Sequence, residues 1–203
     1  NTLSEVLVNN GIKEYAVSET QKYGHVTYFW NGNRSEKFDE NLEVFEEVRS
    51  DTVPFEQRPW MKAAEVTDKV LQAIYSGEYG FIRANFPNGD MVGHTGVEAA
   101  AIKAIEAVDE CVGRAVDAIK EVDGQMFICA DHGNAEQLVD YETGEPFTAH
   151  TTNPVPFILV NADPSYTLRE GGRLADIVPT LIELMGMEQP EEMTGKSLLV
   201  KKA

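Results

Sequence analysis

Apolar residues recur at helical spacing in four parts of the chain. This spacing places them on one face of a helix, as in an amphipathic helix that packs against a core. The predicted helices are Leu3–Asn10, Lys62–Tyr75, Val97–Val122 and Leu174–Met185. Thr2 and Glu5 form a predicted capping box at the start of the first helix, and Gly11 and Gly124 stand where the first and third helices end.

Short apolar runs lie between these helices and indicate strands. The predicted strands are Glu14–Ser18, Tyr79–Phe86, Met126–Ala130 and Phe157–Val160. We expect Met126–Ala130 to be a buried strand. Strands that alternate with helices predict an α/β fold, in which a sheet carries helices on both faces.

The remaining segments are predicted as turns, loops or solvated faces. The turns are Asn31–Arg34 and Asp131–Asn134, and the loops are Pro87–Gly96 and Thr148–Pro156. Gln21–Trp30 is aromatic and fits a strand and a helix equally well. The acidic runs Glu36–Glu47 and Glu188–Glu192 are predicted to be solvated faces.

The composition is that of a globular domain with an unusually acidic balance. The chain has 203 residues, 42% of them hydrophobic, which suits one domain or two small ones. The formal net charge of −17 argues against a nucleic acid or an anionic membrane surface as partner. No apolar run approaches the roughly 18 residues of a membrane span. Because the chain is so acidic, any phosphate site on it must be locally basic or be made basic by metal ions.

The cysteines indicate the cellular compartment of the protein, and the first residue indicates whether the sequence is part of a longer chain. Cys111 and Cys129 lie in no CxxC or zinc-type cluster, and two thiols do not form a disulfide framework. No secretory signal opens the sequence. We therefore expect a reduced, cytoplasmic setting. The chain begins with Asn1 rather than Met, which indicates a piece of a longer protein.

Candidate chemistry lies where predicted strands end or begin. Asp90 and His94 follow one strand, Asp131 and His132 follow another, and His150 precedes a third. Side chains just beyond the carboxyl ends of strands line the ligand crevice of an α/β sheet. The loop that carries His150 must fold back to reach this crevice.

Carboxylate and imidazole donors without thiolates suit a divalent ion such as Mn²⁺ or Zn²⁺. Asp90, His94 and His150 supply three ligands for one ion, and Asp131 and His132 supply two for another. Two ions ~3.5–4 Å apart clamp a transferring phosphoryl group. Each motif alone is common in ordinary loops and turns. The metal hypothesis therefore depends on all of them together.

Lys22 is a further candidate, with two interpretations. It lies in the polar segment 19–25, which is typical of a solvated stretch after a strand. A lysine there is also suited to present a point charge to phosphate oxygens. The residue pattern alone leaves both interpretations open.

Four motifs together resemble the cofactor-independent phosphoglycerate mutases, a family of the alkaline phosphatase superfamily. They are Thr20–Phe29, Asn88–Gly96, Ala130–Glu136 and Ala149–Pro156, and they occur in the family's order. The resemblance implies an alkaline-phosphatase-like sheet that is incomplete in this chain.

The resemblance also implies an activity and a site. The family interconverts 3-phosphoglycerate and 2-phosphoglycerate through a phosphoserine intermediate with two metal ions, often Mn²⁺. By motif, Asp90, His94 and His150 resemble the ligands of one ion, and Asp131 and His132 those of the other. Lys22 is similar to the lysine that contacts the transferring phosphoryl group.

The chain departs from the family in length. Members are more than twice as long and carry, near their N-terminus, a metal-binding aspartate, the nucleophilic serine and an inserted substrate-binding domain. All of these would precede Asn1. The resemblance therefore implies that residues 1–203 are the C-terminal portion of the phosphatase-like domain, that the chain alone is inactive and that the complete protein is monomeric.

Two alternatives remain open. The first is another phosphotransferase of the superfamily, such as a phosphopentomutase or a phosphodiesterase, against which the Lys22 segment argues. The second is a non-catalytic domain that binds metal or a partner.

Overall fold

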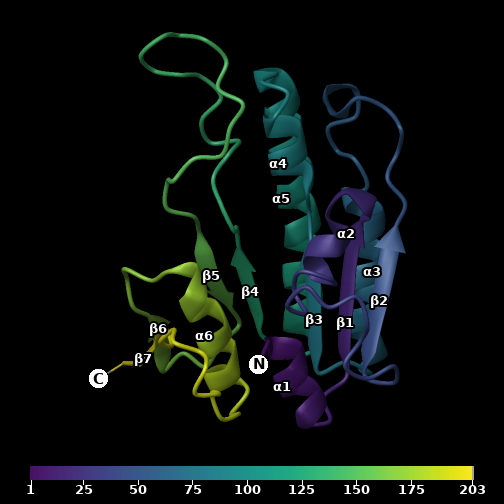
Figure 1. The fold of residues 1–203 in the computed structure, drawn as a ribbon, viewed down its shortest axis with the longest axis vertical. Coiled ribbons are helices and arrows are strands. Elements are labelled where there is room, and N and C mark those ends of the chain that lie inside the picture. The colour runs from purple at the N-terminus through teal and green to yellow at the C-terminus, as the bar shows by residue number, and fades with distance from the viewer. Residues whose placement is uncertain (203) are drawn as a thin grey trace.

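A three-stranded parallel sheet lies at the centre of the fold, in a computed structural model that describes residues 1–202. Its strands are β1 (Glu14–Glu19), β2 (Glu43–Val48) and β3 (Phe81–Asn85), in the order β2-β1-β3. Tyr15 of β1 pairs with Val44 of β2 and with Ile82 of β3. Because all three strands run the same way, their carboxyl ends meet at one edge of the sheet (Figure 1).

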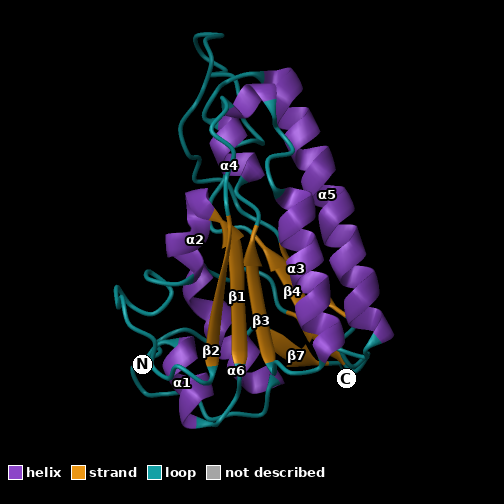
Figure 2. Ribbon diagram, turned by 90° about the vertical axis from the view of Figure 1, so that its right-hand side faces the viewer, coloured by secondary structure: helices purple, strands orange, loops and turns teal. Residues whose placement is uncertain are grey.

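Helices cover both faces of this sheet, which confirms the predicted α/β class (Figure 2). The helices are α1 (Leu3–Asn9), α2 (Thr20–Val26), α3 (Ala63–Ser76), α4 (Asn88–Gly93), α5 (Glu98–Glu121) and α6 (Ile177–Leu184), and the short 3₁₀ turns are η1 (Phe55–Gln57) and η2 (Leu174–Asp176). Helices α3 and α5 lie on one side of the sheet, and α1 and α2 lie on the other (Figure 2).

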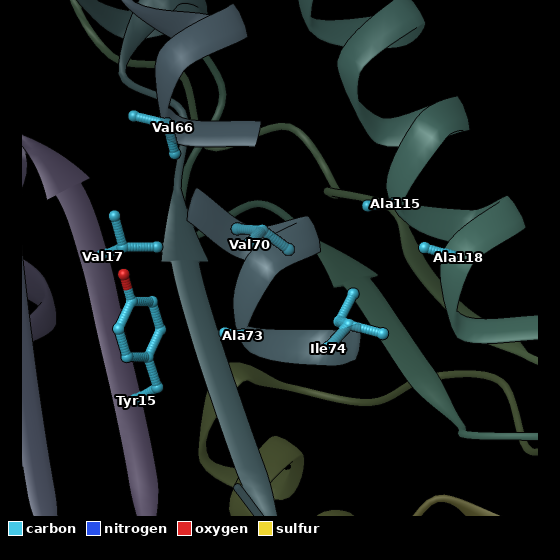
Figure 3. Packing of buried hydrophobic residues seen from close by; sticks show 8 residues of the cluster. All are labelled: Tyr15, Val17, Val66, Val70, Ala73, Ile74, Ala115 and Ala118. Carbon is cyan, nitrogen blue, oxygen red and sulfur yellow. The ribbon is translucent and has the colours of Figure 1, made fainter. Parts of the chain in front are cut away.

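The main core lies between β1 and the helices α3 and α5 (Figure 3). Tyr15 and Val17 of β1 point toward α3, which presents apolar residues at helical spacing. The buried members of this cluster are Tyr15, Val17, Val66, Val70, Ala73, Ile74, Ala115 and Ala118. The α5 residues among them are alanines, whose small side chains let the long helix pack closely. The apolar spacing that predicted α3 is therefore the spacing of its buried face. In α5 the buried positions are alanines and Cys111, whereas the larger apolar residues Ile102 and Ile105 are exposed.

Two antiparallel strand pairs complete the described chain. In the first, β4 (Met126–Cys129) pairs with β5 (Phe157–Val160), and Cys129 stands opposite Phe157. In the second, β6 (Tyr166–Leu168) pairs with β7 (Leu199–Lys201). The prediction of a buried strand at Met126–Ala130 is wrong in its burial, because β4 has one paired neighbour among residues 1–202 and its side chains are partly exposed.

The acidic run Glu36–Glu47 is not a solvated face, because it contains β2. Glu43 is fully buried and accepts hydrogen bonds from the Asn31 side chain at 2.7 Å and from the backbone N–H groups of Phe38 and Asp39. A carboxylate can be buried when its oxygens are satisfied in this way. The glutamates of the other run, Glu188–Glu192, are exposed as predicted.

Three further local predictions need correction, and the structure decides one segment that the sequence left open. The predicted loop Pro87–Gly96 contains the short helix α4, and the ambiguous segment Gln21–Trp30 is helical to Val26 and then turns. The first turn of the predicted helix Leu174–Met185 is the 3₁₀ turn η2. Thr2 stands at the N-cap of α1 without a side-chain capping hydrogen bond, so the predicted capping box does not form.

None of the helices among residues 1–202 combines the length and the apolar character that crossing a membrane requires. This agrees with the absence of a long apolar run in the sequence.

Candidate metal centre

Four predicted site residues meet at the end of the sheet where β3 and β4 finish. Asp90 lies in α4, which begins three residues after β3, and His94 caps the same helix. The spacing of four residues puts both side chains on one side of α4. His132 comes three residues after the end of β4, and His150 comes from the segment before β5.

The antiparallel pairing of β4 with β5 explains how His150 reaches the site. Because the strands run in opposite directions, the start of β5 lies beside the end of β4. An isolated bridge between Gly133 and Thr151 continues this pairing beyond the strands. The expectation that the His150 loop folds back to the crevice is therefore confirmed.

The three imidazoles surround one oxygen of Asp90. Asp90 Oδ1 lies 2.9 Å from His150 Nε2, 3.0 Å from His94 Nε2 and 3.9 Å from His132 Nε2. The rings of His132 and His150 stack with centroids 3.7 Å apart and planes at 15°. Donor atoms of Asp90, His132 and His150 all lie within 4.8 Å of one another, a separation that one metal ion can bridge.

Asp131 lies at the margin of this cluster. Its side chain is 70% exposed, and its Oδ1 lies 3.6 Å from His132 Nε2. The structure places Asp131 beside its chain neighbour His132 and outside the group formed by Asp90, His132 and His150. It also brings His132 to the group around Asp90, a proximity that the sequence did not predict.

Lys22 binds the second oxygen of Asp90. Helix α2 begins where β1 ends, which carries Lys22 to the site, and its Nζ lies 2.5 Å from Asp90 Oδ2. Burial raises the pKa of the Asp90 carboxyl, but the Lys22 ammonium and lesser contributions from His94 and Asn134 outweigh it and lower that pKa to about 2. The carboxylate is therefore ionised at neutral pH. Lys22 is not a solvated surface lysine, since its side chain is 17% exposed.

The donor set fits a divalent cation. His94 Nδ1 lies 2.6 Å from the carbonyl oxygen of Thr148, which can only accept a hydrogen bond, so Nδ1 carries a proton and Nε2 is the nitrogen that faces Asp90. Metal-binding histidines commonly have such an N–H to carbonyl contact. His94 Nε2 also lies 3.1 Å from His150 Nε2. Imidazole nitrogens and a carboxylate that converge this closely form a suitable site for a positive ion.

Sequence reasoning missed the residues that support the cluster. Asn134 Nδ2 donates to Asp90 Oδ1 at 3.1 Å, and Glu136 accepts hydrogen bonds from the segment after His150. Both residues belong to the quoted motif Ala130–Glu136, which was the available signal. His25, the fourth histidine, packs against Phe29 with ring centroids 5.2 Å apart and planes tilted at 52°.

The comparisons with known proteins agree on one family. A sequence profile described as the metalloenzyme superfamily matches residues 1–189. The chain is 62% identical over 203 residues to the 2,3-bisphosphoglycerate-independent phosphoglycerate mutase of Lachnoclostridium phytofermentans. It is 52% identical over 200 residues to the enzyme of the same name from Clostridium botulinum, Langeland strain. These alignments cover 100% and 98% of this chain and 39% of each relative, so the chain spans about two fifths of their length.

A solved structure gives the same result for the fold. The structure of Leishmania mexicana phosphoglycerate mutase at low cobalt concentration matches with a TM-score of 0.92 and 42% sequence identity. The match covers 98% of this chain and 39% of that one. The chain therefore belongs to the metalloenzyme superfamily, and its fold is that of part of a phosphoglycerate mutase.

Proposed function

We propose that this chain is the C-terminal portion of the metal-binding domain of a phosphoglycerate mutase. The complete protein interconverts 3-phosphoglycerate and 2-phosphoglycerate through a phosphoserine intermediate. The observation that carries this proposal is the convergence of His94, His132 and His150 on Asp90, with Lys22 on its other oxygen. The names of the relatives supply the reaction.

The site residues divide between two divalent ions, with Mn²⁺ as the preferred metal. Asp90, His94 and His150 hold one ion, and Asp131 and His132 contribute to the other. When bound, such ions supply positive charge that stabilises a transferring phosphoryl group. This charge compensates for the net −17 of the chain, which otherwise disfavours a phosphorylated substrate.

Besides the metal ions, the proposed site has a positive charge that comes from the chain, which is the ammonium group of Lys22. Its ammonium binds Asp90 Oδ2 and lies beside the histidines. When Asp90 binds a metal ion, the Lys22 ammonium becomes available to phosphoryl oxygens within reach of the same side chain. Lysine suits this role because its three rotatable donors adapt to a moving group.

The rest of the protein completes both the sheet and the site. Among residues 1–202, β3 lies at one edge of the parallel sheet, and β4 pairs with β5 alone. The β4–β5 pair lies on the β3 side of the sheet (Figure 1). We place a strand from the remaining part of the protein between β3 and β4, along with the nucleophilic serine and the substrate-binding domain. We further propose a monomeric protein in the cytoplasm without nucleic-acid or membrane partners.

A coupled assay with 3-phosphoglycerate and Mn²⁺ tests this function. The complete protein is expected to turn over, and the isolated 203-residue chain is expected to show no activity above background. No activity in the complete, Mn²⁺-loaded protein would contradict the proposal. Turnover by the repurified chain alone would show that the nucleophile lies within residues 1–203.

A further inference from the structure

Glu136 links the two turns that carry His132 and His150, although the proposed chemistry does not use it. We propose that Glu136 is a positioning residue, which fixes the relative placement of these two histidines and thereby sets the affinity of the site for its metal. This inference rests on the proposed metal centre.

The carboxylate of Glu136 joins the turns through both of its oxygens. Oε1 accepts hydrogen bonds from Thr151 Oγ1 and, at 3.0 Å, from Asn153 Nδ2. Oε2 accepts a hydrogen bond from the backbone N–H of Asn134 at 2.6 Å. Thr151 directly follows His150, and Asn134 comes two residues after His132. One side chain thus holds both histidine-bearing segments.

The backbones of the two turns also approach each other closely. Thr151 N–H donates to Gly133 O at 2.9 Å. A Cβ atom on Gly133 would lie 2.1 Å from Thr151 Oγ1 and 2.2 Å from Glu136 Oε1, so the space for a side chain is already filled. This close approach is consistent with the stacking of the His132 and His150 rings.

The same connections extend to Asp90 through Asn134. This asparagine is 4% exposed, and its Nδ2 donates to Asp90 Oδ1 at 3.1 Å while its backbone N–H binds Glu136. A Cβ atom on Gly93 of α4 would lie 2.2 Å from Asn134 Oδ1, so α4 packs directly on this amide. Glu136 therefore binds the segments that carry His132 and His150 directly and reaches Asp90 through Asn134.

A carboxylate suits this position, and an amide does not. Three donors converge on Glu136, and an ionised carboxylate has acceptor sites for all of them. Burial raises the pKa of Glu136, but the hydrogen bonds from Thr151, Asn153 and Asn134 outweigh it and lower that pKa, so the side chain is ionised at neutral pH. A glutamine would turn its NH₂ group toward one of these donors. The two turns would then lose a connection and move more freely before metal binds.

The test is a calorimetric titration of the complete, metal-depleted protein with Co²⁺. Residues that orient metal ligands typically change affinity 10- to 100-fold when they are replaced. Glu136→Gln is expected to weaken Co²⁺ binding about 10- to 100-fold, and Thr151→Val is expected to weaken it in the same direction. Glu145→Gln is the matched control, since Glu145 is an exposed carboxylate of the same region, and it is expected to bind Co²⁺ as the parent does.

Two further measurements distinguish positioning from general damage. If Glu136 acts through the histidines, saturating Co²⁺ restores kcat in Glu136→Gln, and KM for 3-phosphoglycerate stays unchanged. Undiminished Co²⁺ affinity in Glu136→Gln, together with loss of binding in His150→Ala, would overturn the positioning role and leave the metal centre intact. Undiminished affinity in His150→Ala would instead overturn the metal centre itself.

Discussion

Asp90 receives a different kind of contact on each of its two oxygens. Oδ2 binds the ammonium of Lys22, and Oδ1 faces the Nε2 atoms of His94 and His150 at 3.0 and 2.9 Å. A lysine and a metal ion can therefore share one carboxylate. Their removal should have different consequences, which allows the two roles to be separated by mutation.

Lys22→Ala in the complete protein should lower kcat with a smaller change in KM, because the lost charge acts mainly on the transition state. Loss of one such electrostatic contact commonly costs roughly 3–4 kcal/mol of barrier, about a hundred- to thousandfold in rate. Metal content, measured by emission spectrometry, should stay unchanged. Lys103→Ala on the exposed side of α5 is the control. Near-native turnover in Lys22→Ala would remove Lys22 from the site.

A buried ion pair joins elements of the central sheet. Arg83 of β3 donates to the Glu14 carboxylate of β1, and its Nε donates to Val26 O at the end of α2 at 2.7 Å. Glu14 is fully buried beside Glu43, its register partner in β2. Burial raises the pKa of Glu14 in spite of Arg83, so the carboxylate depends on this guanidinium for its charge.

Arg83→Ala is expected to lower the free energy of unfolding by about 3–5 kcal/mol, because it leaves a buried carboxylate unpaired. Arg114→Ala removes a comparable pair with Asp68 on the surface, where the expected loss is about 0–1 kcal/mol. Urea denaturation of Arg83→Ala, Arg114→Ala and the parent protein measures these losses of unfolding free energy. The additional change Glu14→Gln should recover part of the loss in Arg83→Ala. Equal stability of the two single variants would contradict this description of the buried pair.

Asp176 connects the start of α6 to the segment before β7. Its carboxylate accepts hydrogen bonds from the backbone N–H of Lys196 at 2.8 Å and of Arg173 at 3.0 Å. The Lys196 contact is the main cause of a lowered pKa at Asp176. Because the folded-state pKa lies below the unfolded value of about 3.9, this group stabilises the fold above that pH, and the contribution is lost as pH falls through the folded-state pKa.

Asp176→Asn should therefore flatten the decline of unfolding free energy between about pH 5 and pH 2. The decline is measured by urea denaturation at a series of pH values. Asp109→Asn, an exposed change on α5, should leave its slope as in the parent. A slope in Asp176→Asn as steep as in the parent would show that other carboxylates account for the acid sensitivity.

The sequence predicted those elements whose apolar residues recur at helical spacing or form a short uninterrupted run. Helices α3 and α5 and strands β1 and β3 lie within a few residues of the predicted ranges. Strand β2 was missed because Glu43 is buried through hydrogen bonds rather than through apolar contact. Strands β6 and β7 have three residues each, too few for a pattern to show.

The residues of the candidate site also fall into those that the sequence predicted and those that it missed. Asp90, His94, His132 and His150 were found because metal-compatible residue types stand beside predicted strands. Glu136 and Asn134 were missed because carboxylates and amides are common in turns, and their hydrogen bonds reach segments distant in sequence. The proximity of His132 to Asp90 depends on how β4 and β5 lie against α4, which no local pattern encodes.

At the scale of the whole molecule, the proposed metal site lies at the edge where the parallel strands of the described chain end. The parallel strands bring Lys22 and Asp90 to one edge, and the β4–β5 pair brings two histidines to them. The chain spans about two fifths of the length of its relatives, and under the proposed function the complete protein supplies the remaining site residues. The metal site is thus the place where the two parts are expected to meet.

Crystallography of the complete protein soaked with Mn²⁺ tests the metal centre most directly. Diffraction at a wavelength where manganese scatters anomalously locates the ion independently of any assumption about its ligands. We expect a peak within about 2.5 Å of the Asp90 carboxylate and of His150 Nε2, and a weakened or absent peak in His150→Ala. Full manganese occupancy elsewhere in the crystal, with no peak beside Asp90, would contradict the account.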